Sequence, residues 1–190
     1  RQAIADWYQT HYNVKVSAER IIVTPGASGA LLLAMGALLD NGRKVMLADP
    51  GYPCNRHFAR FVEGEVNAVP VKAESHYQLN AKHVEDYWDA ETSLALVASP
   101  SNPTGTVLTK SELAALSAAV KKEQGTLIVD EIYHGLTYDG FDAPTALGVD
   151  DKAFVINSFS KFFGMTGWRL GWLVVPEGYT EVMDRLAQNL

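Results

Sequence analysis

The sequence of 190 residues has little of what marks several classes of protein. Its one cysteine, Cys54, allows neither a disulfide framework nor a cysteine-based zinc site, which fits a reducing cytoplasm. No apolar run approaches the length of a membrane span, and no signal peptide precedes the helical pattern that starts at Arg1. The five histidines show no metal-ligand spacing and H-E-x-x-H is absent, so we expect no metal.

Positive charge is also scarce. The net charge is -6 and the longest basic run is the pair Lys121 and Lys122, which argues against a nucleic-acid surface. The Walker spacing and G-x-G-x-x-G are both missing, so nothing indicates a nucleotide site. What the chain does have is a hydrophobic content of 47%, enough for one domain with a large core.

Apolar runs predict seven strands, at residues 21–23, 44–48, 65–71, 94–98, 126–129, 154–157 and 170–175. Helical patterns are expected at residues 1–11, 30–39, 80–88, 110–122 and 177–190. Strands that alternate with helices indicate a three-layer α/β/α domain with a mostly parallel sheet. The seventh strand follows the sixth too closely for a parallel crossover, so it should run antiparallel. Asn80 should cap one helix, and Thr109 with Glu112 should form a capping box for the next.

Polar or glycine-rich segments follow five of these strands. The segments contain residues 26–28, Tyr52, Asn102, Asp130 and residues 158–161. In an open, mostly parallel sheet, ligands bind at the carboxyl ends of the strands. The order of the motifs along the chain therefore predicts that they converge on one site.

The stretch from Ser158 to Trp172 reads S-F-S-K-F-F-G-M-T-G-W-R-L-G-W and is centred on Lys161. An amine held at a strand end where water is scarce, among serine hydroxyls and near Arg169, is suited to Schiff-base chemistry. The alternative is a surface lysine in a glycine-rich turn. The neighbouring motifs favour the first interpretation.

Two further motifs have a defined electrostatic character. The turn Gly26-Ala27-Ser28 leads into a helix, and the unpaired amides of a helix N-terminus favour an anion. Asp130 follows a buried strand directly, and a carboxylate in such a place must find a cation because an unpaired buried charge is costly. As an alternative, Asp130 could simply be the N-cap of a helix.

Together these motifs resemble the class I/II aminotransferases, the pyridoxal-phosphate enzymes of fold type I, over nearly the whole chain. The resemblance implies that Lys161 forms a Schiff base with pyridoxal 5'-phosphate and that Asp130 keeps the pyridine nitrogen charged. It also implies that Tyr133 and Asn102 donate to the ring hydroxyl oxygen, and that Asn102 helps to hold the substrate carboxylate. Lys161, Asp130 and Tyr133 would then be the catalytic residues.

The same resemblance assigns the remaining cofactor contacts. Ala27 and Ser28 would hold the phosphate together with Ser158 and Arg169, whose planar guanidinium suits a phosphate dianion. Tyr52, in a loop with a proline on either side, would stack on the pyridine ring. Cys54 shows no histidine at an activating distance in sequence and is interpreted as packing.

The implied activity is transfer of an amino group between an amino acid and a 2-oxo acid, with glutamate and 2-oxoglutarate as the default pair. The family forms homodimers, so a homodimer is expected. Residues 1–190 are interpreted as a fragment, the cofactor-binding large domain without the N-terminal arm and the C-terminal small domain. We expect this fragment alone to be inactive.

The sequence is also compatible with three other functions. The same lysine and aspartate serve C–S lyases, decarboxylases and synthases of the same fold. An aminotransferase-like sensor domain of a transcriptional regulator would also carry them, together with a DNA-binding segment upstream. A plain α/β binding domain without a cofactor is the third possibility.

Overall fold

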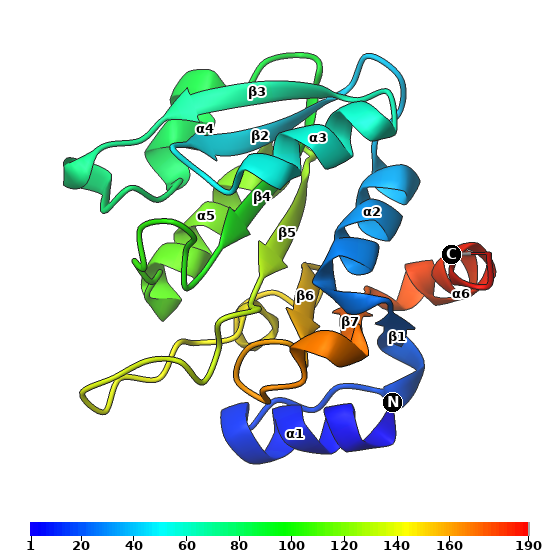
Figure 1. The fold of residues 1–190 in the computed structure, drawn as a ribbon. Helices are drawn as coiled ribbons and strands as arrows, with labels where there is room; N and C mark the ends of the chain where they lie inside the picture. Colours follow the sequence, from blue (N-terminus) through cyan, green and yellow to red (C-terminus); the bar gives the residue numbers. More distant parts are fainter. Residues whose placement is uncertain (190) are drawn as a thin grey trace.

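The computed structural model describes residues 1–189. Within them, seven strands form a sheet in the order β1-β7-β6-β5-β4-β2-β3 (Figure 1). The strands are β1 (Ile21–Thr24), β2 (Lys44–Asp49), β3 (Glu65–Pro70), β4 (Thr92–Ala98), β5 (Thr126–Asp130), β6 (Phe154–Ser158) and β7 (Gly171–Val174). All seven strands expected from the apolar runs are therefore present.

The sheet is parallel from β3 through β6 and antiparallel at β7. β2 pairs in parallel with β3 and β4, and β5 pairs in parallel with β4 and β6. β7 runs antiparallel to both of its neighbours, β6 and β1. The connection between β6 and β7 contains only a short 3-10 helix, Thr166–Trp168, and turns the chain back, as predicted.

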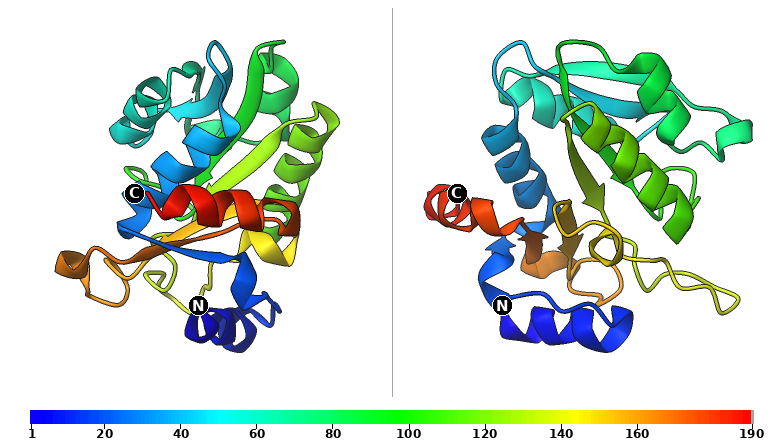
Figure 2. Two further views of the ribbon diagram at one scale, coloured as in Figure 1. Left: turned by 90° about the vertical axis from the view of Figure 1, so that its right-hand side faces the viewer. Right: turned by 180° about the vertical axis from the view of Figure 1, so that it is seen from behind.

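Helices cover both faces of the sheet. They are α1 (Gln2–Tyr12), α2 (Gly26–Leu38), α3 (Pro53–Phe61), α4 (Ala81–Tyr87), α5 (Lys110–Lys122) and α6 (Thr180–Ala187). Figure 2 shows α2, α3 and α6 on one face and α4 and α5 on the other, while α1 lies beside the loops that follow β5 and β6. The expected three-layer α/β/α architecture is confirmed.

The two cores follow from the alternation of side chains along the strands. In β5, Ile128 packs with the α2 layer, whereas Leu127 and Val129 pack with the α5 layer. Because both faces are covered, the three central residues of the strand are all apolar, as is typical of parallel strands. The chain leaves the covered region only after Asp130.

Helix ends agree with the sequence where capping residues mark them. Asn80 accepts a hydrogen bond from the backbone N–H of His83 at the start of α4. Thr109 and Glu112 form the expected capping box of α5. α6 begins at Thr180, after a 3-10 helix at Glu177–Tyr179, and the last residue of the expected helix, Leu190, lies outside the described residues.

Two helical assignments were wrong. α2 begins at Gly26 and not near Ala30, because the small residues of the expected turn already form its first helical turn. α3 was not predicted at all, since its sequence is short and mostly polar and starts with Pro53. Proline is tolerated at the first position of a helix, where its missing N–H costs nothing.

None of the helices in the described part of the chain is long and apolar enough to cross a membrane.

Backbone contact joins β7 to the first turn of α2. An ideal Cβ on Gly171 would lie 2.5 Å from the carbonyl carbon of Gly26 and 2.8 Å from the nitrogen of Ala27. No side chain fits between these backbones. The absence of a Cβ at Gly171 therefore fixes how closely the helix N-terminus approaches the sheet.

We expect Gly171→Ala to lower the free energy of unfolding by roughly 1–3 kcal/mol, because the atoms that it would meet are backbone atoms that cannot rotate away. Gly178→Ala is the matched control, since a Cβ there meets no atom within 4 Å. Urea denaturation of the two variants measures the difference. Equal effects of the two substitutions would contradict this account of the contact.

Candidate active site at the carboxyl ends of the strands

The structure brings all nine predicted site residues to one cavity of about 220 Å³. They are Ala27, Ser28, Tyr52, Asn102, Asp130, Tyr133, Ser158, Lys161 and Arg169. The lining residues of the cavity come from the ends of β5 and β6 and from the start of α2, among others, and these three element ends lie near one another in Figure 1. The convergence expected from the order of the motifs is therefore present.

The start of α2 and Arg169 form the positively polarised side of the cavity. Ala27 and Ser28 occupy the first turn of α2, where backbone N–H groups have no partner within the helix. The Arg169 guanidinium lies directly over this turn, because a Cβ on Gly26 would be 2.8 Å from Nη2. Arg169 Nη1 donates to the carbonyl oxygen of Thr166 at 3.0 Å, which helps to fix the side chain. Helix dipole and guanidinium together suit an anion.

Serine hydroxyls close the base of the loop that carries Lys161. Ser158 Oγ lies 3.0 Å from the carbonyl oxygen of Leu170 and accepts a hydrogen bond from the Ser160 N–H, also at 3.0 Å. Thr166 Oγ1 donates to the Ser160 carbonyl oxygen at 2.6 Å. These bonds tie the end of β6 to the residues before β7. Lys161 is therefore held in a closed loop and not on a free segment.

Lys161 reaches toward Tyr133, with Nζ 5.4 Å from the centre of the tyrosine ring, a cation–π distance. The expectation that water is scarce around this amine is wrong for the described chain, in which Lys161 is exposed at the mouth of the cavity. The sequence places the lysine correctly at a strand end. Shielding depends on what packs over the loop, and nothing in residues 1–189 does so.

Asp130 lies at the inner end of the cavity and is only 7% exposed. Its Oδ1 accepts a hydrogen bond from the Ile132 N–H at 3.1 Å, and burial raises the pKa of the carboxyl to about 6. Within residues 1–189, no Lys, Arg or His forms an ion pair with it. No helix begins at Asp130, so the helix-cap alternative is excluded. The carboxylate is thus buried with room for an external cation beside it.

Asn102 and Tyr133 form the polar wall between these groups. Asn102 Nδ2 donates to the hydroxyl oxygen of Tyr133 at 3.3 Å. Tyr52 lines the same cavity from the loop after β2 and is 38% exposed. A flat ring could therefore contact an aromatic face while its substituents meet an amide and a phenol.

Sequence reasoning missed some of the lining. Leu31, Ala98, Ile132 and Thr166 also line the cavity, and no function was assigned to them, whereas Ser160 was expected only as one of the hydroxyls near Lys161. Thr166 lies within the lysine stretch, yet a small hydroxyl residue in a glycine-rich loop carries no distinguishing spacing. In the described part of the chain, no group of three or more His, Cys, Asp or Glu side chains could hold a metal ion.

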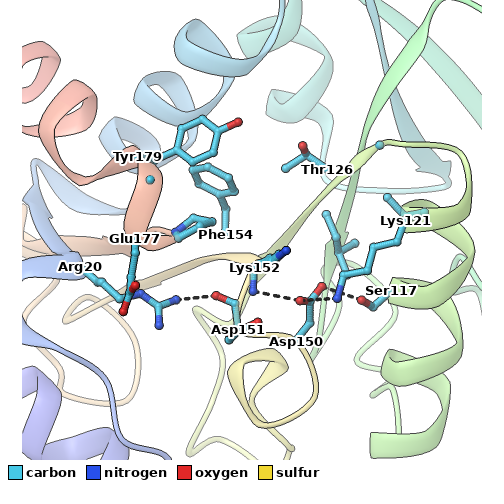
Figure 3. Close-up of a pocket in the computed structure, with 15 residues that line it drawn as sticks. Arg20, Ser117, Lys121, Thr126, Asp150, Asp151, Lys152, Phe154, Glu177 and Tyr179 are labelled. Carbon is cyan, nitrogen blue, oxygen red and sulfur yellow. Dashed lines mark hydrogen bonds and ion pairs between the residues drawn. The ribbon is translucent and has the colours of Figure 1, made fainter.

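A larger cavity, of about 480 Å³, lies at the opposite edge of the sheet, at the amino ends of β5 and β6 (Figure 3). Its polar groups are largely bonded to one another. Asp150 accepts hydrogen bonds from Lys121 Nζ and Ser117 Oγ, both at 2.6 Å, and Arg20 donates to the backbone carbonyl of Asp151 at 2.6 Å. None of the nine predicted residues lines it, so it is not the candidate active site.

The family comparison agrees with this geometry. The family described as aminotransferase class I and II matches residues 1–190. The chain belongs to the class I and II aminotransferase family. C–S lyases and decarboxylases of the same fold differ from aminotransferases in the reaction they catalyse, so the fold alone does not distinguish them.

Relatives in the family show how much of an aminotransferase the chain represents. It is 40% identical over 190 residues to valine–pyruvate aminotransferase of Mycobacterium tuberculosis, covering 100% of this chain and 49% of that protein. It is 32% identical over 194 residues to aspartate aminotransferase of Sulfolobus acidocaldarius, covering 100% of this chain and 48% of that protein. The chain thus spans about half the length of the curated relatives it matches.

Solved aminotransferase structures share the fold. The crystal structure of an aminotransferase from Mycobacterium tuberculosis matches with a TM-score of 0.93 and 40% identity, over 100% of this chain and 52% of that chain. The seven-stranded mixed sheet is therefore that of the fold type I aminotransferases.

The buried carboxyl of this aminotransferase-family chain predicts a pH dependence of stability. The folded pKa of Asp130, about 6, is above the ordinary value of 3.8, so the folded state binds the proton more tightly than the unfolded state. Stability from this group is therefore lost as the pH rises from about 4 to about 6. We expect Asp130→Asn to be more stable than the ligand-free wild type by roughly 1–3 kcal/mol above pH 6. Denaturation from pH 4 to pH 8 measures this gain, and a gain that does not change with pH would contradict it.

Proposed function

We propose that the full-length protein is a pyridoxal-phosphate-dependent aminotransferase that moves an amino group between an amino acid and a 2-oxo acid. The observation that carries this proposal is the Asp130 carboxylate, buried and without a cation among residues 1–189, in the same cavity as the Lys161 amine. An anion site at the start of α2 completes the set. Pyridoxal phosphate has a basic ring nitrogen, an aldehyde and a phosphate, which match these three features.

The residues present fit this cofactor. Asp130 would stabilise the charged ring nitrogen, and Lys161 would hold the aldehyde group. The phosphate would be bound by residues that share one side of the cavity, Ala27, Ser28, Ser158 and Arg169. Tyr52, Tyr133 and Asn102 would contact the ring and its hydroxyl oxygen, and Asn102 would also contact the substrate carboxylate.

When bound, the cofactor supplies an electron sink for the substrate's α-carbon. Lys161 Nζ is the one amine in the described lining of the cavity, and we propose that it takes the proton from the α-carbon as general base. The Lys161 loop is closed by serine and threonine hydrogen bonds, so the backbone that carries the amine is held in place. Asp130 is buried with a pKa of about 6, and a cation beside it would lower that pKa and stabilise the charged form.

The proposal extends to the domain identity, the oligomeric state, the cellular location and the substrates. Residues 1–190 would form the cofactor-binding large domain, with the family's N-terminal arm and small domain outside them. We propose a homodimer in the cytoplasm that takes amino acid and 2-oxo acid substrates and acts on neither nucleic acid nor membrane. The names of the relatives cited above mention valine, pyruvate and aspartate, so the substrate pair is open and glutamate with 2-oxoglutarate is only the default.

Borohydride reduction of the full-length protein loaded with pyridoxal phosphate should attach the cofactor to Lys161, identified by peptide mass spectrometry. Lys161→Ala should lose the label and all turnover, yet bind the cofactor through the phosphate and ring contacts. Lys152→Ala is the matched control, because Lys152 lines the cavity at the opposite edge of the sheet (Figure 3). A label on any residue other than Lys161 would show that Lys161 does not have the proposed role.

A panel of amino donors, including L-valine, L-aspartate, L-glutamate and L-phenylalanine, tests the reaction on the full-length protein. We expect at least one donor to change the absorbance of the bound cofactor and to yield its 2-oxo acid in equal amount. Release of carbon dioxide, or of sulfide from a sulfur-containing donor, would instead favour a decarboxylase or a lyase. A protein that gains no absorbance with pyridoxal phosphate would support a binding domain without this cofactor.

A further inference from the structure

A buried polar cluster lies directly behind the candidate active site. It consists of Tyr12, Glu131, His134 and Thr145, and the function proposed above uses none of them. Glu131 is 0% exposed and His134 is 5% exposed. Their polar side-chain atoms are hydrogen-bonded, as buried polar groups usually are, except His134 Nε2, which has no partner among the described residues.

Sequence position links this cluster to the site. Asp130 and Tyr133 line the cavity, whereas the neighbouring Glu131 and His134 are buried and do not line it. The backbone N–H of His134 donates to the carbonyl oxygen of Glu131 at 2.9 Å, which closes the turn that carries Tyr133. The two site residues and the two cluster residues therefore alternate within one turn.

Glu131 clamps the two ends of the long segment after β5. Its carboxylate oxygens each lie 3.0 Å from Thr145 Oγ1, and Oε1 accepts a hydrogen bond from the Ala146 N–H at 2.7 Å. The segment between Glu131 and Thr145 projects from the body of the molecule (Figure 1, yellow). The clamp keeps the base of this segment fixed even though its tip is exposed.

His134 ties the same turn to α1. Its Nδ1 lies 2.9 Å from the Tyr12 hydroxyl, a hydrogen bond between residues 122 positions apart. The distance from Nδ1 to Glu131 Oε2 is 3.6 Å, too long for a hydrogen bond. Burial raises the pKa of Glu131 to about 8 and lowers the pKa of His134 to about 4, so near neutral pH the two meet as largely uncharged groups. Hydrogen bonds to Thr145, Ala146 and Tyr12, and not an ion pair, hold the turn.

The position of Tyr133 depends more on the hydrogen bonds of Glu131 and His134 than on the burial of its own ring. Its ring is half-buried, its hydroxyl meets Asn102, and the ring faces Lys161. Each of these contacts is with a side chain from another loop. The fixed points of the turn are therefore the Glu131 carboxyl group before Tyr133 and the His134 imidazole after it.

We propose that Glu131 and His134, the latter through Tyr12, are positioning residues that hold Asp130 and Tyr133 in place in the active site. This inference rests on the proposed function. A displacement of about 1 Å at a reacting centre can cost up to roughly 100-fold in rate, so groups that never touch the substrate can control turnover.

The test uses the full-length protein with pyridoxal phosphate and the best donor of the panel. Glu131→Leu and His134→Leu should lower kcat by roughly 10- to 100-fold. The dissociation constant of the cofactor should stay within about threefold, because the phosphate contacts lie on α2 and on the Lys161 loop. Glu131→Gln and His134→Asn should recover most of kcat, since the glutamine keeps an acceptor for Ala146 and the asparagine keeps a polar atom near Nδ1.

Asp150→Asn is the matched control for loss of stability alone. Asp150 is also buried and bonded, to Ser117 and Lys121, but at the opposite edge of the sheet (Figure 3). It should lower the Tm without changing kcat per bound cofactor. If the leucine variants do not fold, Tyr12→Phe removes only the hydroxyl that meets His134, and it should still lower kcat by roughly 3- to 10-fold.

The outcomes distinguish a failure of the positioning role from a failure of the proposed function. Leucine variants, or Tyr12→Phe, that lower the Tm as Asp150→Asn does but keep wild-type kcat would overturn the positioning role alone. A failure of Glu131→Gln and His134→Asn to recover activity would also overturn it. A wild-type protein that binds no pyridoxal phosphate would overturn the proposed function, and the positioning role with it.

Discussion

The constraint on which the site depends is the burial of a carboxylate without a cation of its own. Moving an unpaired charge out of water is costly, and the raised pKa of Asp130 records that cost. Within the described residues Asp130 accepts a hydrogen bond from the Ile132 N–H and forms no ion pair. The start of α2 and Arg169 present the complementary feature, an excess of positive potential. A ligand with a cationic end and an anionic end therefore relieves both at once, and should stabilise the folded state by an amount that grows with the logarithm of its concentration relative to its Kd.

The location of the site followed from the sequence because one topological rule applies to it. β2, β4, β5 and β6 are parallel, so the segments after them meet at one edge. The register bears this out, since Asp130 pairs with Ala98 on one side and with Ile156 on the other. The strand order did not follow in the same way. The insertion of β7 between β1 and β6 is set by packing and leaves no local signature.

Other features of the site could not be predicted from the sequence because they depend on contacts between residues far apart in the chain. The D-E-I-Y motif contains two acidic residues, and only the course of the chain shows that Asp130 lines the cavity while Glu131 is buried behind it. The partners of the buried cluster, Tyr12 and Thr145, come from segments far apart in the chain. The exposure of Lys161 has the same origin, since local pattern places a residue at a strand end but does not say what covers it.

The pairing of the first strand with the last has a consequence for how the domain is made. Ile21 pairs with Val174, and Thr24 with Gly171, so β1 has no neighbour in the sheet until the residues of β7 have been synthesised. Pairings this distant in sequence are slow to form, and an early strand must wait for them on the ribosome with its edge uncovered. The first turn of α2 follows β1 directly and packs on Gly171. A nascent chain that stops short of β7 would therefore lack the backbone that this turn packs against.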